Sequence, residues 1–247
     1  MADPVLELED VGKSFGALKA VDGVSMSVEG GSRWAVIGPN GAGKTTLFRL
    51  ISGEHSLSAG SIQLFGRDVD GVPEHRRVRM GVCRTFQITN LFQDLTVEEN
   101  VTIAAQAMSP RRFAFWRRST LPSELRDRAD RALELIDLAD RRKRVVKELS
   151  HGEQRQLEIA VGLAQAPKLL LLDEPAAGLS ASERVVMRDL VEGLPKDLSI
   201  ILIEHDMALA LGLVEQVLCM DNGQPIATGT PDEIRENEQV QSVYLKS

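Results

Sequence analysis

Gly38-Pro39-Asn40-Gly41-Ala42-Gly43-Lys44-Thr45 decides the fold of this chain, because it matches the phosphate-binding pattern G-x-x-x-x-G-K-[ST]. The preceding Trp34 to Ile37 are typical of a short buried strand, and Thr46 to Ile51 are typical of the start of a helix. The glycines allow successive backbone N–H groups to point at one anion, and the helix N-terminus adds positive potential. The loop therefore predicts a polyphosphate site; the alternative is a glycine-rich turn that contains a lysine by chance.

The side chains of this loop have different expected roles at a bound nucleotide. Lys44 supplies a positive charge to the β- and γ-phosphates, and the Thr45 hydroxyl is placed to ligate Mg²⁺. We therefore expect ATP with Mg²⁺ as the ligand. The residues expected to line the nucleotide are Gly38, Asn40, Gly41, Ala42, Gly43, Lys44, Thr45 and Thr46.

A second predicted strand ends in two carboxylates, Asp173 and Glu174. The four leucines before them, Leu169 to Leu172, are typical of a strand buried on both faces of a parallel sheet. Ligands of such sheets bind at the carboxyl ends of the strands. We expect Asp173 to hold Mg²⁺ through water and Glu174 to polarise the attacking water. The alternative is an acidic pair that only caps a helix.

Two further polar residues are candidates for the same site. Leu198 to Ile203 predicts a third buried strand, and His205 follows it closely enough to reach the γ-phosphate. Gln87 is a weak candidate by itself, since glutamines are common and usually solvated.

Taken together, these motifs resemble those of the ATP-binding-cassette (ABC) ATPases, and the similarity runs from Leu6 to Leu245. The resemblance implies an α/β fold, with a RecA-like P-loop NTPase core, an N-terminal antiparallel β subdomain and an inserted α-helical subdomain. It also assigns roles along the chain: an adenine-stacking aromatic (Phe15), a Q-loop glutamine at the catalytic and metal site (Gln87), a signature motif (Leu149 to Glu153), a D-loop (Ala177 to Ser180) and a switch histidine (His205).

The signature motif implies a dimer. By resemblance, Ser150 and the Gly152 amide face the γ-phosphate of ATP held by a second ABC ATPase subunit, at the start of a helix near Glu153. Two ATP molecules are then enclosed in a head-to-tail pair of subunits. The chain departs from the family pattern at His151, at Glu153 in place of glutamine, and at Ser180 in place of aspartate.

The order of the motifs predicts one ABC ATP-binding domain over residues 1–247. Residues 1–87 and 166–247 are expected to form the α/β core, and residues 88–165 the helical subdomain with the signature motif. Apolar residues at helical spacing predict a helix over Leu125 to Leu138. Near the end of the chain, Asn222-Gly223 predicts a hairpin turn, and Thr230-Pro231 predicts a helix start.

Composition narrows the class of protein. The net charge of −7 and the pI near 5.3 argue against a nucleic-acid partner. No apolar stretch approaches the ~20 residues that cross a bilayer, and Met1 to Val5 do not predict a signal peptide. Cys83 and Cys219 lack metal-ligand spacing and are expected to be reduced thiols.

One stretch of the expected helical subdomain, residues 110–118, places three aromatics between two pairs of arginines (Pro-Arg-Arg-Phe-Ala-Phe-Trp-Arg-Arg). Such a segment suits a lipid headgroup surface or an acidic permease loop. The alternative, which we favour, is a solvated linker whose aromatics cover the helical subdomain.

The chain resembles one branch of the family in particular, at four stretches of its sequence: Arg84 to Gln87, Leu95 to Asn100, Asp173 to Leu179 and Ile203 to Met207. It comprises the ATPase subunits of bacterial importers for branched-chain or related hydrophobic amino acids, amides or urea. The resemblance implies two identical or different ATPase subunits, transmembrane permease subunits and an external solute-binding protein, with this chain peripheral on the cytoplasmic side of the inner membrane. The alternatives are a lipid or lipopolysaccharide exporter ATPase and a non-transport ABC ATPase.

Overall fold

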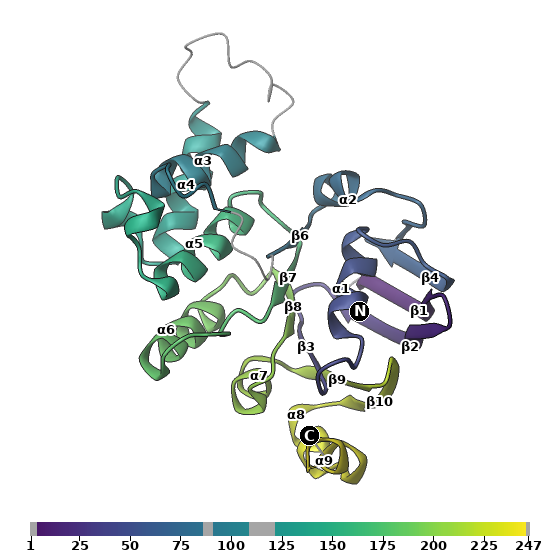
Figure 1. The fold of residues 1–247 in the computed structure, drawn as a ribbon. Helices are drawn as coiled ribbons and strands as arrows, with labels where there is room; N and C mark the ends of the chain where they lie inside the picture. Colours follow the sequence, from purple (N-terminus) through teal and green to yellow (C-terminus); the bar gives the residue numbers. More distant parts are fainter. Residues whose placement is uncertain (1–3, 86–90, 109–121, 246–247) are drawn as a thin grey trace. The chain divides into compact units, whose positions relative to one another are not determined.

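The computed structural model describes residues 4–85, 91–108 and 122–245. The chain divides into two compact units (Figure 1). The α/β unit comprises Met1–Arg84, Lys168–Glu174 and Pro195–Ser247, and the helical unit comprises Thr85–Pro167 and Pro175–Leu194. Pro175–Leu194 belong to the helical unit, where their helix packs, whereas the sequence places these residues in the core.

A six-stranded sheet forms the centre of the α/β unit, and β3 lies between β9 and β8. All neighbouring strands run parallel except β9 and β10, which pair antiparallel. Every residue of β7 and β8 is buried, as their unbroken apolar sequences lead one to expect. In sheet order, the strands are β10 (Gln224–Gly229), β9 (Gln216–Asp221), β3 (Arg33–Ile37), β8 (Ser199–Ile203), β7 (Leu169–Asp173) and β6 (Val82–Arg84).

A second, antiparallel sheet belongs to the same unit and has the order β2-β1-β4-β5. Buried and exposed residues alternate along the second half of β2, so one face of this sheet is turned to the core. Helix α1 (Lys44–Ser52) shares one hydrophobic core with both sheets. The strands are β1 (Pro4–Phe15), β2 (Leu18–Glu29), β4 (Ala59–Leu64) and β5 (Arg67–Asp68).

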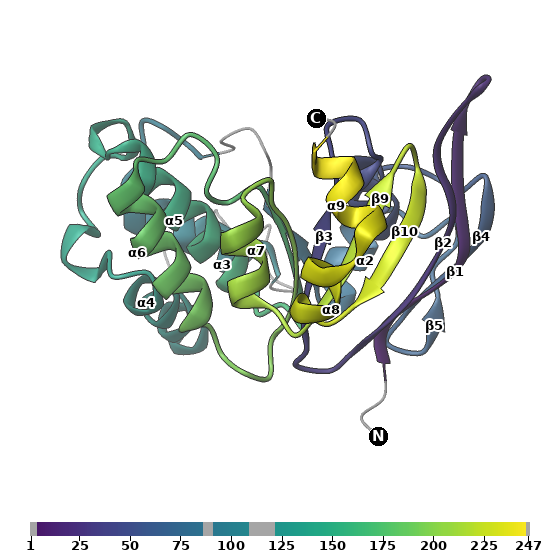
Figure 2. The same ribbon diagram turned by 90° about the horizontal axis from the view of Figure 1, so that it is seen from below.

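The remaining helices of the α/β unit pack around its six-stranded sheet. α7 packs against β3, whereas α8 and α9 pack against β10 (Figure 2). The turn between β9 and β10 is the predicted one, since Asn222 and Gly223 both have positive φ, at 48° and 82°. Thr230 caps α8, as predicted from its sequence. The helices are α2 (Glu74–Met80), α7 (Met207–Leu213), α8 (Pro231–Glu236) and α9 (Glu238–Leu245).

In the helical unit, α3, α4 and α5 pack against one another, and α6 packs against α5. The predicted helix over Leu125 to Leu138 is α4, which spans Ser123–Leu135. Three helices are preceded by a Ser or Thr N-cap that exchanges hydrogen bonds with a Glu three residues later: α3 (Val97–Ala107), α5 (His151–Leu163) and α6 (Ala181–Glu192). Two 3₁₀ turns, η1 (Ala139–Arg141) and η2 (Val146–Glu148), lie between α4 and α5.

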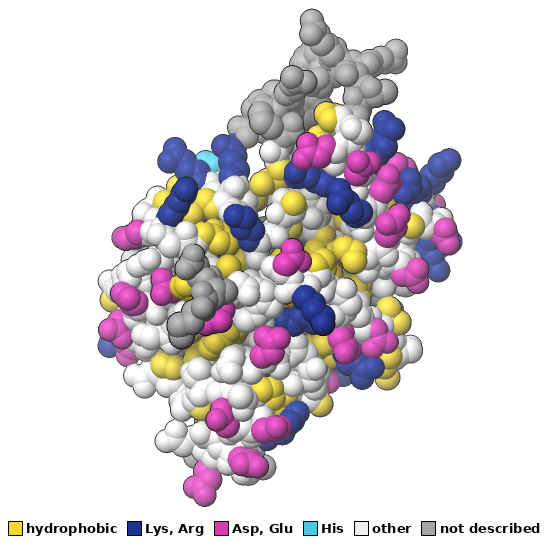
Figure 3. Space-filling view, turned by 180° about the vertical axis from the view of Figure 1, so that it is seen from behind, with side chains coloured by type: hydrophobic (Ala, Val, Ile, Leu, Met, Phe, Trp, Pro, Cys, Tyr) yellow, Lys and Arg dark blue, Asp and Glu magenta, His cyan; other side chains and the backbone are white. Residues whose placement is uncertain are grey.

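The surface carries charges of both signs. On the face drawn in Figure 3, Lys and Arg side chains are interspersed with Asp and Glu side chains. This agrees with the composition, which has 29 basic and 36 acidic residues. Within the described ranges, every helix is too short or too polar to cross a bilayer.

Buried Arg77 fastens the C-terminal end of α1. Its side chain comes from α2 and is almost fully buried, with 4% of the residue exposed. Nη1 donates to the carbonyl oxygens of Leu50 (2.8 Å) and Ile51 (3.0 Å) in the last turn of α1. Nε and Nη2 donate to the carbonyl oxygens of Val72 (2.9 Å) and Val69 (2.8 Å). One guanidinium therefore donates to two carbonyls in the last turn of α1, one of which, that of Leu50, also accepts from the Gly53 amide at 3.3 Å.

We predict that Arg77→Ala lowers the free energy of unfolding by about 3 kcal/mol, because buried carbonyls lose a charged donor. Urea unfolding followed by circular dichroism measures this change. The matched control is Arg76→Ala on the exposed face of α2, which should change the same quantity by no more than about 0.5 kcal/mol. Equal stability of the two variants would contradict the role given to Arg77.

Candidate nucleotide and catalytic site

Two glycines shape the predicted phosphate-binding loop, which connects β3 to α1. Gly38 has φ +147°, and a β-carbon there would lie 2.1 Å from the carbonyl oxygen of Met220. Gly43 has φ +98°, and a β-carbon there would lie 2.3 Å from the carbonyl oxygen of Ala20. Both contacts are with backbone atoms, so no side chain fits at either position.

The loop is braced by its neighbours in the α/β unit. The Gly223 amide, in the β9–β10 turn, donates to the carbonyl of Ala42 at 3.1 Å, and the Leu47 amide donates to the carbonyl of Gly43 at 2.9 Å. α1 begins at Lys44, two residues before the expected start at Thr46. The first turn of α1, with its N–H groups and positive dipole end, therefore starts inside the motif.

Lys44 is held inside the loop, with only 5% of the residue exposed. Its Nζ donates to the carbonyl oxygens of Gly38 (2.7 Å) and Pro39 (2.9 Å). Burial lowers the pKa of Lys44, and the charges of Glu174 and Asp173 partly oppose this shift. Both predicted acidic residues thus act electrostatically on the predicted phosphate-binding lysine.

Asp173 ends β7, and its side chain is fully buried. Its Oδ2 accepts a hydrogen bond from Nη2 of Arg84 at 2.8 Å. Nη1 of Arg84 forms an ion pair with Oε1 of Glu54. The sequence interpretation gave no role to Arg84 or Glu54, although a charged residue that ends a fully buried strand, as Arg84 ends β6, requires a partner.

Glu174 and His205 lie together at the ends of the adjacent strands β7 and β8. Glu174 has φ +50°, a conformation that costs a non-glycine residue roughly 1–3 kcal/mol, and its amide donates to the carbonyl of Ile203 at 3.0 Å. Its Oε1 lies 2.7 Å from Nε2 of His205. An ionised carboxylate can only accept, so in that state Nε2 of His205 is the donor. The predicted base and the predicted switch histidine are therefore hydrogen-bonded to each other.

Phe15, the expected adenine-stacking residue, lies at the end of β1 and is 46% exposed. Its ring meets His55 edge to face, with 5.4 Å between centroids, and Nζ of Lys13 lies 5.2 Å from the ring centroid. An exposed aromatic of this kind is available to stack on a base. Its role at a bound nucleotide stays a prediction.

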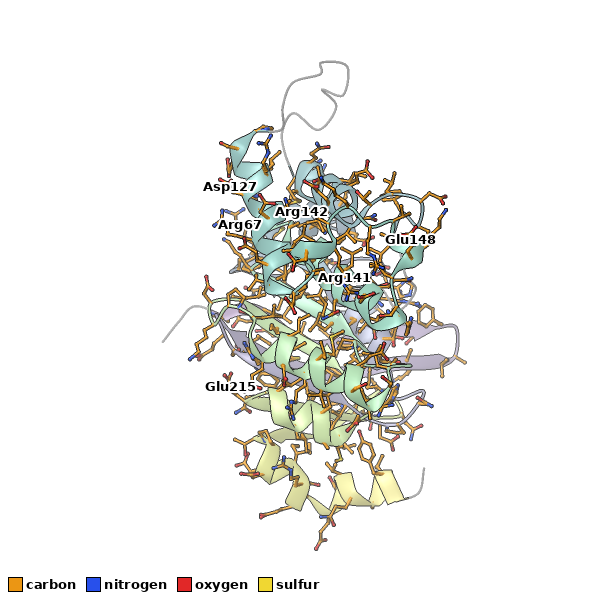
Figure 4. The ribbon with its side chains drawn as sticks, turned by 90° about the vertical axis from the view of Figure 1, so that its left-hand side faces the viewer. Arg67, Asp127, Arg141, Arg142, Glu148 and Glu215 are labelled. Carbon is orange, nitrogen blue, oxygen red and sulfur yellow. The ribbon has the colours of Figure 1, made fainter. Side chains whose placement is uncertain are left out.

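The predicted signature motif forms the start of α5 in the helical unit. Ser150 is the N-cap: its Oγ accepts from the Glu153 amide at 3.2 Å, and Oε2 of Glu153 accepts from the Ser150 amide at 2.8 Å. Glu153 also forms an ion pair with Arg141, which is labelled in Figure 4 on the segment between α4 and α5. The glutamate that departs from the family pattern thus caps the helix. α5 begins at His151, two residues before the expected position.

The same unit brings the signature motif and the predicted D-loop into contact. The Gly152 amide, which was expected to face a phosphate, donates to Oε1 of Glu183 at 3.2 Å. Oε2 of Glu183 accepts from the Ser180 amide at 2.9 Å, so Ser180 and Glu183 form the cap of α6. Hydrogen bonds from Ser180 are the main cause that lowers the pKa of Glu183. Sequence interpretation missed Glu183, whose capping pattern S-x-x-E was the available signal.

Gln87 and the arginine–aromatic stretch 110–118 lie outside the described residues. Within the described ranges, no group of three or more His, Cys, Asp or Glu side chains could hold a metal ion. The Thr45 hydroxyl and the buried Asp173 carboxylate are oxygen donors of the type that Mg²⁺ prefers, together with nucleotide phosphates and water. These residues fit a metal that binds with its nucleotide.

The cysteines agree with the expectation of unpaired thiols. Cys83 and Cys219 are both free and buried. Burial raises the pKa of each thiol to about 12. Thiols with so high a pKa are poor nucleophiles, so we assign them no chemistry.

Comparison with known proteins shows which families and solved structures the chain resembles. A family model described as "ABC transporter" matches residues 21–177, and a second, described as "Branched-chain amino acid ATP-binding cassette transporter", matches residues 224–245. The chain is 39% identical to the high-affinity branched-chain amino acid transport ATP-binding protein LivG of Salmonella typhimurium and 37% identical to BraF of Pseudomonas aeruginosa, covering 99% of each chain. The lipopolysaccharide export system ATP-binding protein LptB of Haemophilus influenzae is 33% identical, over 98% of this chain and 97% of LptB.

Solved structures agree with these relatives. The ADP conformation of MJ1267, an ATP-binding cassette of an ABC transporter, superposes with a TM-score of 0.88 and 30% identity over the whole of both chains. A nucleotide-free ATP-binding cassette from an ABC transporter gives a TM-score of 0.84 at 30% identity, over 98% of this chain and 99% of that one.

We predict that Lys44→Ala weakens ATP binding roughly 10- to 100-fold, because a charge-assisted bond to phosphate is lost. Isothermal titration calorimetry with ATP and Mg²⁺ measures the effect. Lys147→Ala, at an exposed lysine of the helical unit paired with Asp94, is the control and should keep the wild-type affinity. Unaltered ATP affinity of Lys44→Ala would exclude this loop as the phosphate site.

Proposed function

The chain belongs to the ABC transporter family and is one of its ATP-binding-cassette ATPases, and from this we propose that it powers an importer for branched-chain or related amino acids or amides. The observation that carries the proposal is the match of residues 224–245 to the C-terminal family model of branched-chain amino acid transporters. The higher identity to LivG and BraF than to LptB supports an importer over a lipopolysaccharide exporter.

Nucleotide binding is proposed to use the α/β unit. The loop amides and Lys44 hold the β- and γ-phosphates, and Phe15 stacks on adenine. Mg²⁺, when bound with the nucleotide, neutralises phosphate charge, and Thr45 and Asp173 are the residues that would hold it. Gln87 is the remaining proposed metal-site and catalytic residue.

Hydrolysis is proposed to use the Glu174–His205 pair. Glu174 accepts a proton from the attacking water, and it emerges from β7 one residue after Asp173. The 2.7 Å contact with His205 holds the Glu174 carboxylate in place, and the His205 side chain, which is 44% exposed, contacts the γ-phosphate in this proposal. Because phosphoryl transfer depends chiefly on positioning and charge stabilisation, this pair requires no covalent intermediate.

A second ATPase subunit is proposed to complete each site. Ser150 and Gly152 at the start of α5 face the γ-phosphate held by that subunit. In this structure the Gly152 amide donates to Glu183, so the phosphate has to take the place of a carboxylate oxygen. The second subunit is a copy of this chain or a related ATPase.

Assembly with the membrane follows from the same proposal. The subunit binds transmembrane permeases on the cytoplasmic side of the inner membrane and meets the extracytoplasmic solute-binding protein only through them. Nucleic acid is not a proposed partner, since the chain is acidic.

The catalytic assignment predicts that Glu174→Gln keeps ATP binding but lowers turnover at least about 100-fold, because the amide cannot accept the proton. The ATP-bound variant should then accumulate as a dimer, which size-exclusion chromatography with light scattering detects. Glu236→Gln, at an exposed glutamate of α8, is the control and should hydrolyse ATP at the wild-type rate. Hydrolysis by Glu174→Gln within about tenfold of wild type would move the base elsewhere.

The transport assignment is tested in the native cells. Deletion of the gene should abolish uptake of radiolabelled leucine and valine at low concentration, and the wild-type gene should restore it where Glu174→Gln does not. Affinity purification of the tagged protein from membranes should recover permease subunits. Normal leucine uptake with loss of surface lipopolysaccharide would favour the exporter instead, and co-purification with nucleic acid or ribosomes would exclude a transport role.

A further inference from the structure

We propose that Arg84 is a positioning residue for Mg²⁺–nucleotide binding: through its contact with Oδ2 it fixes the orientation of the Asp173 carboxylate at the metal site. The inference rests on the proposed function, in which Asp173 is a metal-site residue. Arg84 itself touches neither metal nor nucleotide in this proposal.

The sheet places Arg84 beside Asp173. β6 and β7 are parallel neighbours, and Arg84 pairs with Leu171, two residues before Asp173. Residues two apart on a strand point to the same face of the sheet. The long side chain of Arg84 therefore runs along that face to Asp173, where Nη2 lies 2.8 Å from Oδ2.

Both partners are buried, which strengthens the ion pair between them. The Arg84 side chain is 4% exposed and the Asp173 side chain is fully buried. A buried charge needs a charged, hydrogen-bonded partner, and interactions between charges are strengthened where water is excluded. The Asp173 carboxylate is thus confined to one orientation by the guanidinium.

Arg84 is itself fixed from the other side. Nη1 pairs with Oε1 of Glu54, two residues beyond the end of α1. Ser52 Oγ donates to the same Glu54 oxygen at 3.2 Å, and Nε of Arg49 lies 3.7 Å from Oε2. A planar guanidinium can bridge two carboxylates in a fixed geometry, which an ammonium group cannot reproduce.

This bridge ties together the two proposed metal-site residues of the chain that the structure describes. Thr45 is at the start of α1, Glu54 follows the end of α1, and Arg84 connects Glu54 to Asp173. Mg²⁺ demands near-ideal octahedral geometry at 2.0–2.1 Å. The ion pairs from Glu54 through Arg84 to Asp173 fix the Asp173 carboxylate relative to α1, and so meet this demand.

The two possible roles of Arg84, as a positive charge and as a positioning contact, predict opposite changes in Mg²⁺ affinity when Arg84 is removed. If the guanidinium acted only as a charge, its removal would make the site more negative and raise its affinity for Mg²⁺. If it positions Asp173, its removal lowers that affinity, by roughly 10- to 100-fold as for other residues that orient a metal ligand. The sign of the change therefore tests the proposal.

The experiment measures ADP binding to the full chain by isothermal titration calorimetry, once with Mg²⁺ and once with EDTA. ADP avoids any dependence on hydrolysis. For Arg84→Ala, the ratio of the EDTA Kd to the Mg²⁺ Kd should fall at least about tenfold relative to wild type, with the EDTA Kd unchanged within about twofold. An equal loss in both conditions, no change, or tighter Mg²⁺-dependent binding would each overturn the proposal.

Two further variants support this comparison. Arg49→Ala removes an exposed arginine whose ion pair is with Glu54, and it should keep the wild-type ratio of the two Kd values. Arg84→Lys keeps the positive charge but lacks the planar guanidinium, so it should recover only part of the ratio of the EDTA Kd to the Mg²⁺ Kd. It also serves as the test if Arg84→Ala does not fold. Full recovery of the ratio by Arg84→Lys would overturn the role of the planar guanidinium.

Asp173→Ala separates this inference from the proposed function. If Asp173→Ala leaves the Mg²⁺ effect on ADP binding intact, Asp173 is not a metal-site residue and the proposed function of this carboxylate fails. If Asp173→Ala abolishes the effect and Arg84→Ala does not, only the positioning role of Arg84 fails.

Discussion

The hydrogen-bond register of three adjacent parallel strands is the constraint on which the α/β unit depends. β3, β8 and β7 lie side by side, and Asp173 pairs directly with Ile203. Parallel strands place their carboxyl ends at one edge, so the loop after β3, Glu174 and His205 all emerge there. A shift of one residue in the register of β7 would turn Asp173 to the opposite face of the sheet.

The other rigid part of the site is α1, which is fastened at both ends. At its start, backbone contacts leave no room for side chains at Gly38 and Gly43. At its end, Arg77 binds the last carbonyls, and Glu54 is paired with Arg84. Pre-organised supports of this kind reduce the conformational freedom that a ligand would otherwise have to remove on binding. Two buried arginines that touch no nucleotide in our proposal are therefore part of how the site is built.

Local sequence signals predicted most of the fold, whereas the pairing partners required the tertiary structure. The strand–loop–helix around Lys44, the buried leucine strand and the Asn222-Gly223 turn are short-range patterns, and the structure has all three. Arg84 and Asp173 are 89 residues apart, so their contact depends on β6 being the neighbour of β7. Glu153 was interpreted as a departure from a motif, but its partner three residues earlier makes it a helix cap. The grouping of Pro175–Leu194 with the helical unit depends likewise on helix packing.

The contact between Gly152 and Glu183 changes how association with a second subunit should be described. The amide at the start of α5 already has an anionic neighbour of the same chain, which the cap of α6 also holds. In the dimer that we propose, the γ-phosphate held by the second subunit would have to replace this carboxylate at the Gly152 amide, so association would exchange one anion for another. The strength of the proposed association would then depend on the difference between two similar electrostatic attractions, and so small a difference would keep the dimer reversible.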